Sequence, residues 1–407
     1  MKTAAIICEY NPFHNGHLYH IEKTKRILGA DYIIALMSGN YVQRGGPAVM
    51  EKKLRTKMAL MNGADLVLEL PLWFSAGSAP YFADGSVALL DSLGVVDILS
   101  FGSECGSLSR LLSLGNFLAD REQDLTEQVK LLLKTGISYP KARENAFLSL
   151  GCSKSDTEIL KEPNNLLGLE YIMALKRRNS SIRPFCIPRK QSSHHSLDLT
   201  GDISSASAIR SRLAVFDGLN KSLGSVPENL HPLLRDTYQR QYPVLLDDFS
   251  DLLSYKLCMD SSFEDYWDIS GDLSDRIKNM TVPGQPFSCQ IEAVKNKSLT
   301  WSRISRGFLH ILLNMKQSCN DRYVDSGQPL YFQILGFRKE ASVLIREIKN
   351  NKHWPMVRHL RPLEDPLTNV QEQMLSTEQK ADALYQMILR AKFKTKLKEE
   401  QIIISST

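Results

Sequence analysis

Two histidines, His14 and His17, stand three residues apart around Gly16, directly after an apolar run and directly before a helix-like pattern. Imidazoles at this spacing can donate hydrogen bonds to phosphate oxygens and stabilise the charge that develops on a leaving pyrophosphate. A glycine lets a ligand approach the backbone closely, and a helix that starts just after it supplies free N–H groups and a partial positive charge. This is the chemistry of nucleotidyl transfer. The alternative for these residues taken alone is a loop with two solvated histidines.

Apolar strand patterns alternate with helical patterns around this corner of the chain. The strand patterns cover 4–8, 31–37, 64–71, 95–102 and 183–188. The helical patterns cover 17–28, 51–63, 84–94 and 204–216. Such β-α-β units predict a parallel sheet, and ligands bind these sheets at the carboxyl ends of the strands. The first strand ends near Cys8, so the histidine corner falls at that edge.

The character of the sequence changes near residue 217. Beyond it, helical patterns are broken by polar loops, and the main strand pattern is at 331–337. A chain of 407 residues is long enough for two domains. We therefore predict an α/β fold with a Rossmann-like parallel-sheet catalytic domain over 1–216, followed by a mainly α-helical domain over 217–407.

Composition excludes several classes of protein. The seven cysteines form no C-x-x-C pair, and their odd number fits a reduced, cytoplasmic compartment. No segment has 18 consecutive apolar residues, and the apolar run at the N-terminus is too short for a signal peptide, so no membrane is expected. A net charge of +5 permits a polyanionic partner. No obligate protein partner is evident.

A second motif, SSASAIR at 204–210, starts the helix that follows the fifth strand pattern. The hydroxyls of Ser205 and Ser207 can hold phosphates, and Arg210 brings a fixed positive charge to a triphosphate. Alone, the string is also typical of an ordinary capped helix. Together with YNPFHNGH at 10–17, it resembles the signatures of the HIGH-type nucleotidyltransferases, although Ser204 stands where an apolar residue is usual and Ser207 replaces the common Thr. The resemblance gives His14, His17 and Arg210 catalytic roles.

Longer strings are similar to one branch of that superfamily, the tRNA(Met) cytidine acetate ligases. They are MSGNYVQRGGPAV at 37–49, RTKMALMNGADLVLELP at 55–71, FGSECG at 101–106 and KEPNNLLGLEY at 161–171. The resemblance implies that acetate attacks the α-phosphate of ATP to give acetyl-adenylate and pyrophosphate. The exocyclic amine (N4) of the wobble cytidine of elongator tRNA(Met) then takes the acetyl group, forms N4-acetylcytidine and releases AMP.

The resemblance also implies ATP contacts at individual positions. Gly102 ends the fourth strand at the ligand edge, where a side chain would block the nucleotide. An Asn amide at 164 or 165 can bind an adenine or ribose edge, although capping of the next helix explains the pair equally well; Asn165 is the expected contact. Arg189 can reach the nucleotide, unless it is a solvated loop arginine. The expected contacts are Ile7, Cys8, Glu9, Tyr10, Asn11, Pro12, Phe13, His14, Asn15, Gly16, His17, Leu18, Tyr19, His20, Gly102, Asn164, Asn165, Arg189, Ser205 and Ser207.

Other polar residues are weaker candidates. His20 has the spacing of a helix-surface histidine. Arg44 and Lys52 can hold acetate or phosphate, but charged loop residues are usually solvated. The pair His194–His195 suggests a metal, but no cysteine or carboxylate stands nearby at ligand spacing, so we expect a polar loop and no protein metal site. Mg²⁺ is expected to come with ATP, held mainly by phosphates and water.

The second half of the chain carries basic residues interleaved with aromatic ones. Arg303 and Arg306 lie in a stretch, 301–316, that contains Trp301 and Phe308 and no acidic residue. Basic side chains grip phosphate and rings stack on unpaired bases, so this pattern favours tRNA binding by Arg303 and Arg306. The alternative is a set of solvated helix faces.

Two other functions are compatible with the motifs. A small-molecule nucleotidyltransferase of cofactor synthesis would share the first half, but such enzymes seldom need a large basic second half. A non-catalytic protein that binds nucleotide and RNA would not need His14, Gly16, His17 and Arg210 all intact. An aminoacyl-tRNA synthetase is disfavoured because no clear K-M-S-K-S string follows.

Overall fold

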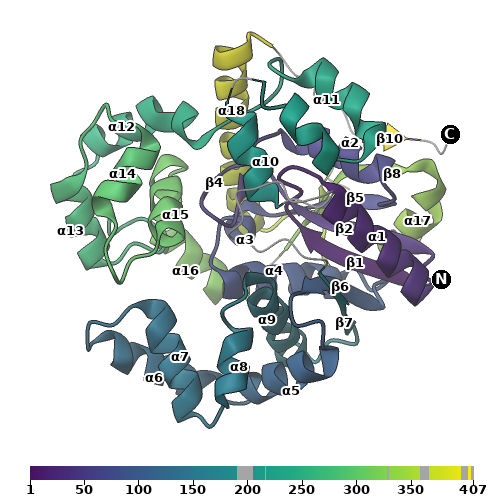
Figure 1. Ribbon diagram of the computed structural model, residues 1–407, viewed down its shortest axis with the longest axis horizontal. Helices are drawn as coiled ribbons and strands as arrows, with labels where there is room; N and C mark the ends of the chain where they lie inside the picture. Colours follow the sequence, from purple (N-terminus) through teal and green to yellow (C-terminus); the bar gives the residue numbers. More distant parts are fainter. Residues whose placement is uncertain (190–204, 216, 328–329, 358–365, 396–401, 405–407) are drawn as a thin grey trace.

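One mixed sheet forms the centre of the molecule in the computed structural model (Figure 1). The structure describes residues 1–407 except 190–204, 216, 328–329, 358–365, 396–401 and 405–407. The strand order is β10-β8-β5-β2-β1-β6-β7, with β9 beside β8. Because β2 and β6 lie on opposite sides of β1, the chain reverses its direction of winding at β1, which is where such sheets bind ligands.

The five strand predictions in the first half are confirmed. The parallel strands are β1 (Thr3–Cys8), β2 (Tyr32–Ser38), β5 (Leu66–Leu70), β6 (Ile98–Ser103) and β7 (Arg183–Pro188). Within β2, Ile34 and Leu36 belong to one hydrophobic cluster, whereas Ile33 and Ala35 belong to another. Both faces of the sheet are therefore buried, which explains why these strands are continuous apolar runs.

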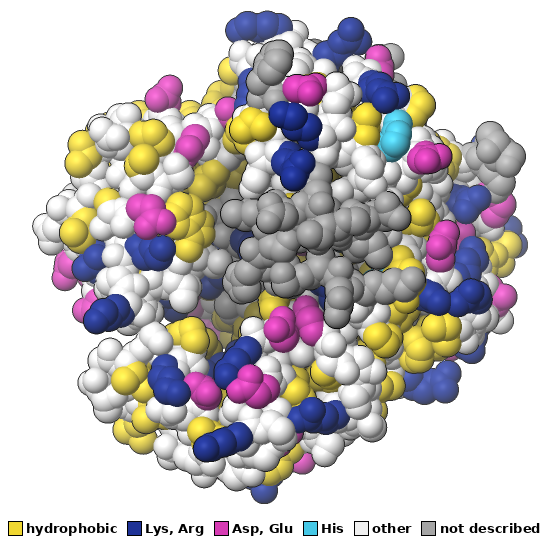
Figure 2. Space-filling model, viewed as in Figure 1, with side chains coloured by type: hydrophobic (Ala, Val, Ile, Leu, Met, Phe, Trp, Pro, Cys, Tyr) yellow, Lys and Arg dark blue, Asp and Glu magenta, His cyan; other side chains and the backbone are white. Residues whose placement is uncertain are grey.

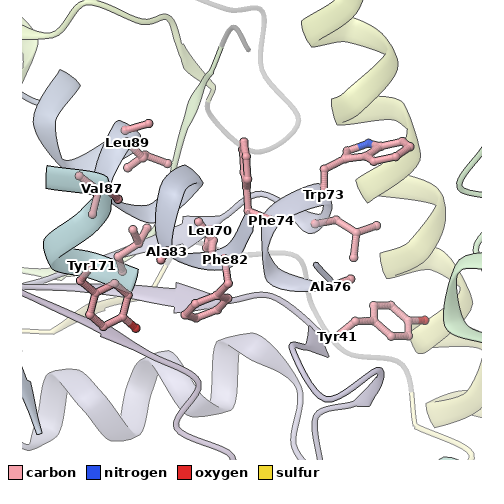
Figure 3. Packing of buried hydrophobic residues seen from close by; sticks show 14 of the residues in the cluster. Tyr41, Leu70, Trp73, Phe74, Ala76, Phe82, Ala83, Val87, Leu89 and Tyr171 are labelled. Atoms are coloured by element: carbon pink, nitrogen blue, oxygen red, sulfur yellow. The ribbon is translucent and has the colours of Figure 1, made fainter. Parts of the chain in front are cut away.

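Helices supply the other side of each cluster. One face packs against α1 (Asn15–Leu28), α2 (Lys52–Met61) and α10 (Ala206–Leu213). The other face packs against α3 (Leu72–Ser75), α4 (Ala79–Ser92) and α9 (Pro163–Arg177). In Figure 3, Val87 and Tyr171 lie on one side of the residues drawn from this second cluster, and Tyr41 and Trp73 lie on the other.

The second half of the chain completes the sheet instead of standing apart from it. The strand expected at 331–337 is β8 (Phe332–Arg338), which runs antiparallel to β5. Two short strands, β9 (Met356–Val357) and β10 (Ile402–Ile404), run parallel to β8. Without β8, β5 would be an edge strand with unpaired backbone groups. The sheet thus contains strands from both sides of residue 217, and the expected division there does not separate the sheet from the C-terminal region.

A long helix, α18 (Asn369–Phe393), fixes the C-terminal region to the first half. The hydroxyl of Tyr385 donates to the carbonyl of Ala48 at 2.7 Å. Beside it, the buried Lys52 ammonium contacts Glu69 at 2.8 Å and Asp382 of α18 at 2.5 Å. Lys52 therefore belongs to a buried ion cluster, and acetate or phosphate does not explain its position. Removal of one partner would leave a buried charge uncompensated, so the cluster ties α18 to this register.

Two groups of helices extend from the sheet (Figure 1). The first contains α5 (Leu108–Ala119), α6 (Glu122–Leu133), α7 (Tyr139–Ser149) and α8 (Lys154–Ile159). The second contains α12 (Ser250–Met259), α13 (Gly271–Met280), α14 (Phe287–Val294) and α15 (Trp301–Leu312). Among the described residues, no helix combines the length and the apolar character that crossing a membrane requires.

The basic helix α15 is largely a core element. Phe308 and His310 are fully buried, and the two ring nitrogens of His310 lie 2.8 Å and 3.0 Å from the carbonyl oxygens of Trp267 and Ala76. The expectation that Phe308 presents a ring to RNA is therefore wrong. The stripe of apolar residues along α15 faces the protein, and the sequence pattern did not distinguish this stripe from a stacking surface.

Candidate active site

A cavity of about 360 Å³ opens at the carboxyl ends of β1 and β6. Its walls come from the start of α1, the end of β6, the starts of α9 and α10, and the turn between β3 (Tyr41–Val42) and β4 (Gly46–Pro47). The expected contacts that line it are Ile7, Cys8, Glu9, Tyr10, Asn11, His14, Gly16, His17, Tyr19, His20, Gly102, Asn164, Arg189, Ser205 and Ser207, and the expected catalytic residue Arg210 lines it too.

Five of the expected contacts lie outside the cavity lining: Pro12, Phe13, Asn15, Leu18 and Asn165. Phe13 is fully buried and Leu18 packs against the hydrophobic cluster under α1. The amide of Asn15 donates to the carbonyl of Gly224 at 3.1 Å. A continuous segment cannot turn every side chain to one ligand, so the range 7–20 divides between the cavity and the core.

The histidine pair caps the N-terminus of α1. His14 Nδ1 accepts a hydrogen bond from the Gly16 N–H at 3.0 Å, and His17 Nδ1 accepts one from the His14 N–H at 3.2 Å. The two rings stack, with centroids 3.7 Å apart and planes 23° apart. A nitrogen that accepts a hydrogen bond carries no proton, so in each neutral ring the proton is on Nε2. Both imidazoles thus have an Nε2–H donor available at a helix N-terminus.

These histidines are neutral at pH 7. Burial lowers the pKa of His14 to about 3, and the nearby Arg189 and Arg210 lower it further. Burial, followed by the charges of His14 and Arg189, holds the pKa of His17 well below its ordinary value. Neutral rings can stack closely, whereas two imidazolium ions would repel each other. The pair therefore presents two neutral, preorganised hydrogen-bond donors to the cavity, and positive charge comes from the nearby arginines.

Arg210 points from α10 back to the histidine corner. Its Nη1 donates to the carbonyl of Asn11 at 2.7 Å and its Nη2 donates to Ser207 Oγ at 3.0 Å. Ser205 caps α10 by accepting from the Ala208 N–H at 3.1 Å. The second motif is thus a capped helix, and that helix also carries a guanidinium into the cavity, so the two interpretations of SSASAIR are compatible. Ser204 and the pair His194–His195 lie outside the described residues.

Arg189 stands at the opposite wall. Its N–H donates to the carbonyl of Ser103 at 3.0 Å, which extends the β6–β7 ladder, and its guanidinium lies 3.8 Å from Glu104. A Cβ on Gly102 would lie 3.4 Å from Arg189 Cγ. That is ordinary van der Waals contact, so the protein itself leaves room for a side chain at this position, and the expected clash with a nucleotide stays a prediction.

The choice of Asn165 over Asn164 is not supported by the structure. Asn165 is buried, and its Oδ1 accepts from Ser103 Oγ at 2.7 Å and from the Cys105 N–H at 3.1 Å. Its amide therefore holds the loop after β6. Asn164 lines the cavity, and its Nδ2 donates to Glu104. The Glu104 carboxylate also accepts from the Asn165 N–H at 3.0 Å, so it caps α9.

His20 differs from the helix-surface histidine that its spacing suggested. Its ring lines the cavity, and its Nε2 lies 3.0 Å from Ser100 Oγ, which in turn lies 2.8 Å from Thr24 Oγ1. Burial, with a contribution from Arg189, lowers the pKa of His20 to about 4. Ser100 is paired with Ile6 inside the sheet. His20 therefore reaches below the ligand edge, deeper than the histidine pair.

Gln43 and an apolar wall of the cavity were not predicted, whereas Arg44 was among the weaker candidates. The β3–β4 turn contributes Gln43 and Arg44 to the cavity lining. Burial lowers the pKa of Arg210, while the charge of Glu9 raises it and the charge of Arg44 lowers it, so both of these groups lie near Arg210. An apolar wall joins the cavity to the core; its residues are Ile6, Ala79, Phe82, Phe101, Pro163, Leu166, Leu167, Tyr171, Ile187 and Pro188. In sequence these apolar residues resemble core residues, so no signal distinguishes them.

The two arginines expected to bind tRNA are paired within the protein. Arg303 and Arg306 lie 3.4 Å and 3.8 Å from Asp268, and their side chains are 37% and 13% exposed. The same helix supports the β3–β4 turn, because Ser305 Oγ donates to the carbonyl of Gly45 at 2.8 Å. A Cβ added at Gly45 would lie only 2.3 Å from the backbone nitrogen of Arg306, so the turn and the helix are in close contact here. Helix α15 therefore helps to shape the cavity wall that carries Arg44.

Comparison with known proteins agrees with this geometry. The HIGH Nucleotidyl Transferase family profile matches residues 1–401. The tRNA(Met) cytidine acetate ligase of Halothermothrix orenii is 38% identical, over 89% of this chain and 88% of that protein. The protein of the same name from Acetivibrio thermocellus is 35% identical over 95% of each chain. The chain belongs to the tRNA(Met) cytidine acetate ligase family.

Solved structures of a family member extend the likeness to the whole fold. Thermotoga maritima TmcAL, crystallised with alpha-thio ATP, is 30% identical with a TM-score of 0.86, and each chain is covered completely. The apo crystal form is 29% identical with a TM-score of 0.90, again over both complete chains. The tRNA(Met) cytidine acetate ligase fold therefore includes the C-terminal strands and helices described above, as well as the α/β part that carries the histidine corner.

Proposed function

We propose that this protein is an ATP-dependent ligase that activates acetate as acetyl-adenylate and transfers the acetyl group to N4 of the wobble cytidine of elongator tRNA(Met). The single observation that carries the proposal is the cavity at the β1–β6 switch point. There, two neutral imidazole donors, the α1 N-terminus and the Arg210 guanidinium converge, in a chain that matches the ligase family from end to end. These groups match the charge of a triphosphate and of a leaving pyrophosphate.

The first step requires a carboxylate to reach the α-phosphate. We infer that His14 and His17 donate through Nε2–H to phosphate oxygens, and that Arg210 and Arg189 neutralise the triphosphate from opposite walls. Arg44, on the turn beside Glu9 and Arg210, is the group we assign to the acetate carboxylate. Acetate oxygen then forms a bond to phosphorus, and the bond to the pyrophosphate oxygen breaks.

Magnesium fits this site as a companion of ATP. Among the described residues, no three metal-ligating side chains converge. Triphosphate oxygens and water commonly hold Mg²⁺ with few protein ligands, and the ion would neutralise part of the charge on pyrophosphate.

We assign the tRNA to the two helical groups that extend from the sheet. Figure 2 shows Lys and Arg side chains interspersed with Asp and Glu over the described part of this face, on both groups. The α5–α8 group exposes Lys130, Lys134, Lys141, Lys154 and Lys161. We therefore extend the tRNA surface beyond Arg303 and Arg306 of the C-terminal region to this N-terminal group. We propose a cytoplasmic reaction, because ATP and tRNA are the proposed substrates.

One assay tests the proposal. The purified protein is incubated with carbon-labelled acetate, ATP and total tRNA, and the tRNA is digested to nucleosides. We expect label in N4-acetylcytidine, dependent on ATP, from elongator tRNA(Met) alone. Label in another nucleoside, incorporation without ATP, or adenylylation of a small molecule in place of tRNA would contradict the proposal.

A further inference from the structure

The transfer step needs a proton acceptor, and the histidine pair cannot supply it. The exocyclic amine of cytidine loses a proton as it is acylated, because its product is a neutral amide. In both His14 and His17 the Nδ1 lone pair is occupied by a backbone N–H at 3.0 Å or 3.2 Å. The remaining ring nitrogen carries hydrogen and can only donate. A different group must therefore accept the amine proton.

Glu9 is the one carboxylate among the described residues that line the cavity. Its Oε1 accepts a hydrogen bond from the Gln43 N–H at 3.0 Å, which fixes the side chain against the β3–β4 turn. Its carbonyl accepts from Arg55 Nη1 at 2.6 Å, which fixes the backbone. Within the described part of the chain, Oε2 has no hydrogen-bond donor. The carboxylate is thus partly exposed, held in place at the end of β1, and has one oxygen available.

The other candidate bases are less suitable. Both oxygens of Glu104 already accept hydrogen bonds, from Asn164 and from the N–H of Asn165, and this residue lies outside the cavity lining. His20 reaches below the ligand edge to Ser100. Glu9 stands instead beside Arg210 and the turn that bears Arg44, where the reacting acyl phosphate would lie.

We propose that Glu9 is the general base of acetyl transfer, an inference that rests on the ligase function proposed above. The cytidine N4 attacks the carbonyl carbon of acetyl-adenylate, and a carbon–nitrogen bond forms. Glu9 Oε2 takes a proton from that nitrogen. The bond between the carbonyl carbon and the phosphate oxygen breaks, AMP leaves as the phosphate anion, and the protonated carboxyl returns its proton to solvent. Activation of acetate needs no such base, because a carboxylate carries no proton to lose.

The test measures the two half-reactions separately in the full-length protein. Hydroxylamine traps acetyl-adenylate as acetohydroxamate and reports activation, while a single turnover with labelled acetate and tRNA reports transfer. Glu9→Gln keeps an oxygen for the Gln43 N–H but is not basic. We expect it to slow transfer about 100- to 1,000-fold, to slow activation less than about tenfold, and to remove the acid-side limb of the transfer pH profile. Glu9→Asp keeps the base and should recover part of the transfer rate.

Several outcomes would overturn the role of Glu9. Equal slowing of both steps would make it a binding residue, and recovery of activation at high Mg²⁺ would make it a metal ligand. Transfer by Glu9→Gln at nearly the wild-type rate, or a selective loss of transfer in Glu104→Gln or His20→Asn, would assign the proton to another acceptor. If the wild-type protein forms no hydroxamate and transfers no label, the proposed ligase function itself fails, and the role of Glu9 fails with it.

Discussion

The histidine corner with the adjacent Arg210 and helix α15 with its two arginines both present hydrogen-bond donors, yet the donors are held in different ways. At the corner, the polar atoms are held by the backbone: the His14 ring by the Gly16 N–H, the His17 ring by the His14 N–H, and Arg210 by the carbonyl of Asn11. On α15, Arg303 and Arg306 share one acidic partner, Asp268, at longer distances. Chemistry on a phosphate requires donors fixed within a fraction of an ångström, whereas an RNA surface requires charge that adapts. Fixed geometry leaves a short sequence motif, but an adaptable surface does not.

We expect the largest loss of activity from substitutions at the histidine corner. His17→Ala or His14→Ala should each slow formation of acetyl-adenylate about 100- to 1,000-fold, because each removes a preorganised donor to phosphate. Pyrophosphate exchange with acetate and saturating ATP measures this rate. His353→Ala, at an exposed position away from the cavity lining, is the matched control. A His17→Ala protein with nearly unchanged exchange would remove the phosphate role from the corner.

Arg210 should have the next largest effect. Arg210→Ala removes a charge-assisted contact to the triphosphate and should weaken ATP binding by about 2 kcal/mol, roughly 30-fold in Kd. Arg210→Lys should restore only part of the loss. The planar guanidinium can contact Asn11, Ser207 and phosphate at once, whereas a compact ammonium cannot. Calorimetric titration with ATP gives both values. If Arg210→Ala binds ATP as tightly as the wild type, the second motif only caps α10 and does not bind ATP.

The buried histidines also make a pH prediction. Their pKa values are lower in the folded protein, to about 3 for His14 and about 4 for His20, so the unfolded chain binds more protons once the pH falls below about 6.5. The free energy of unfolding should therefore be at its full value above that pH and should decline toward pH 4.5, by about 2 kcal/mol for His14 alone. Urea unfolding at pH 7 and pH 4.5 measures the decline. His14→Asn, which retains a capping group, should make this decline smaller, whereas His353→Asn should leave it unchanged. An equal decline in the wild type and both variants would contradict burial of a neutral imidazole at His14.

The smallest effect is expected on α15. Arg303→Ala should weaken tRNA binding by about 1 kcal/mol and reduce its salt dependence, because this arginine is partly exposed but shared with Asp268. Arg306→Ala should instead slow acetate activation, since Arg306 is mostly buried beside the turn that carries Arg44. Filter binding over a salt series and pyrophosphate exchange separate the two. If both variants lose only tRNA affinity, α15 does not shape the cavity.

The parts of the fold that depend on local sequence were predictable. The five parallel strands and both helix-start motifs follow from apolar runs and capping residues, and the structure has them where the sequence placed them. The antiparallel pairing of β8 with β5 joins residues more than 260 positions apart, and no local pattern encodes such a partner. The same limit applies to the ion cluster of Lys52 with Asp382.

Within the site, residue type was easier to predict than orientation. The motif identified His14, His17 and Arg210, but the direction of each side chain in the segment 7–20 depends on how α1 packs, so Phe13 and Leu18 turned out to face the core. Asn164 and Asn165 are identical in chemistry, and the positions of Ser103 and Cys105 decide which amide is turned away from the cavity. Arg55 gave no sequence signal, although its guanidinium binds the carbonyls of Glu9, Ser38, Gly39 and Met50 and fixes the ends of β1 and β2.

The central claim, that acetate is activated by bonding to the α-phosphate, is tested most directly by following the oxygen atoms of acetate. Acetate labelled with oxygen-18 is incubated with ATP, the protein and tRNA, and the AMP produced is analysed by mass spectrometry. Attack of acetate on the α-phosphate followed by attack of the cytidine amine on the carbonyl carbon leaves one acetate oxygen on phosphorus. We predict AMP that carries one oxygen-18 atom for each acetyl group found on the tRNA. Acetylated tRNA accompanied by unlabelled AMP, or by ADP, would contradict an acetyl-adenylate intermediate.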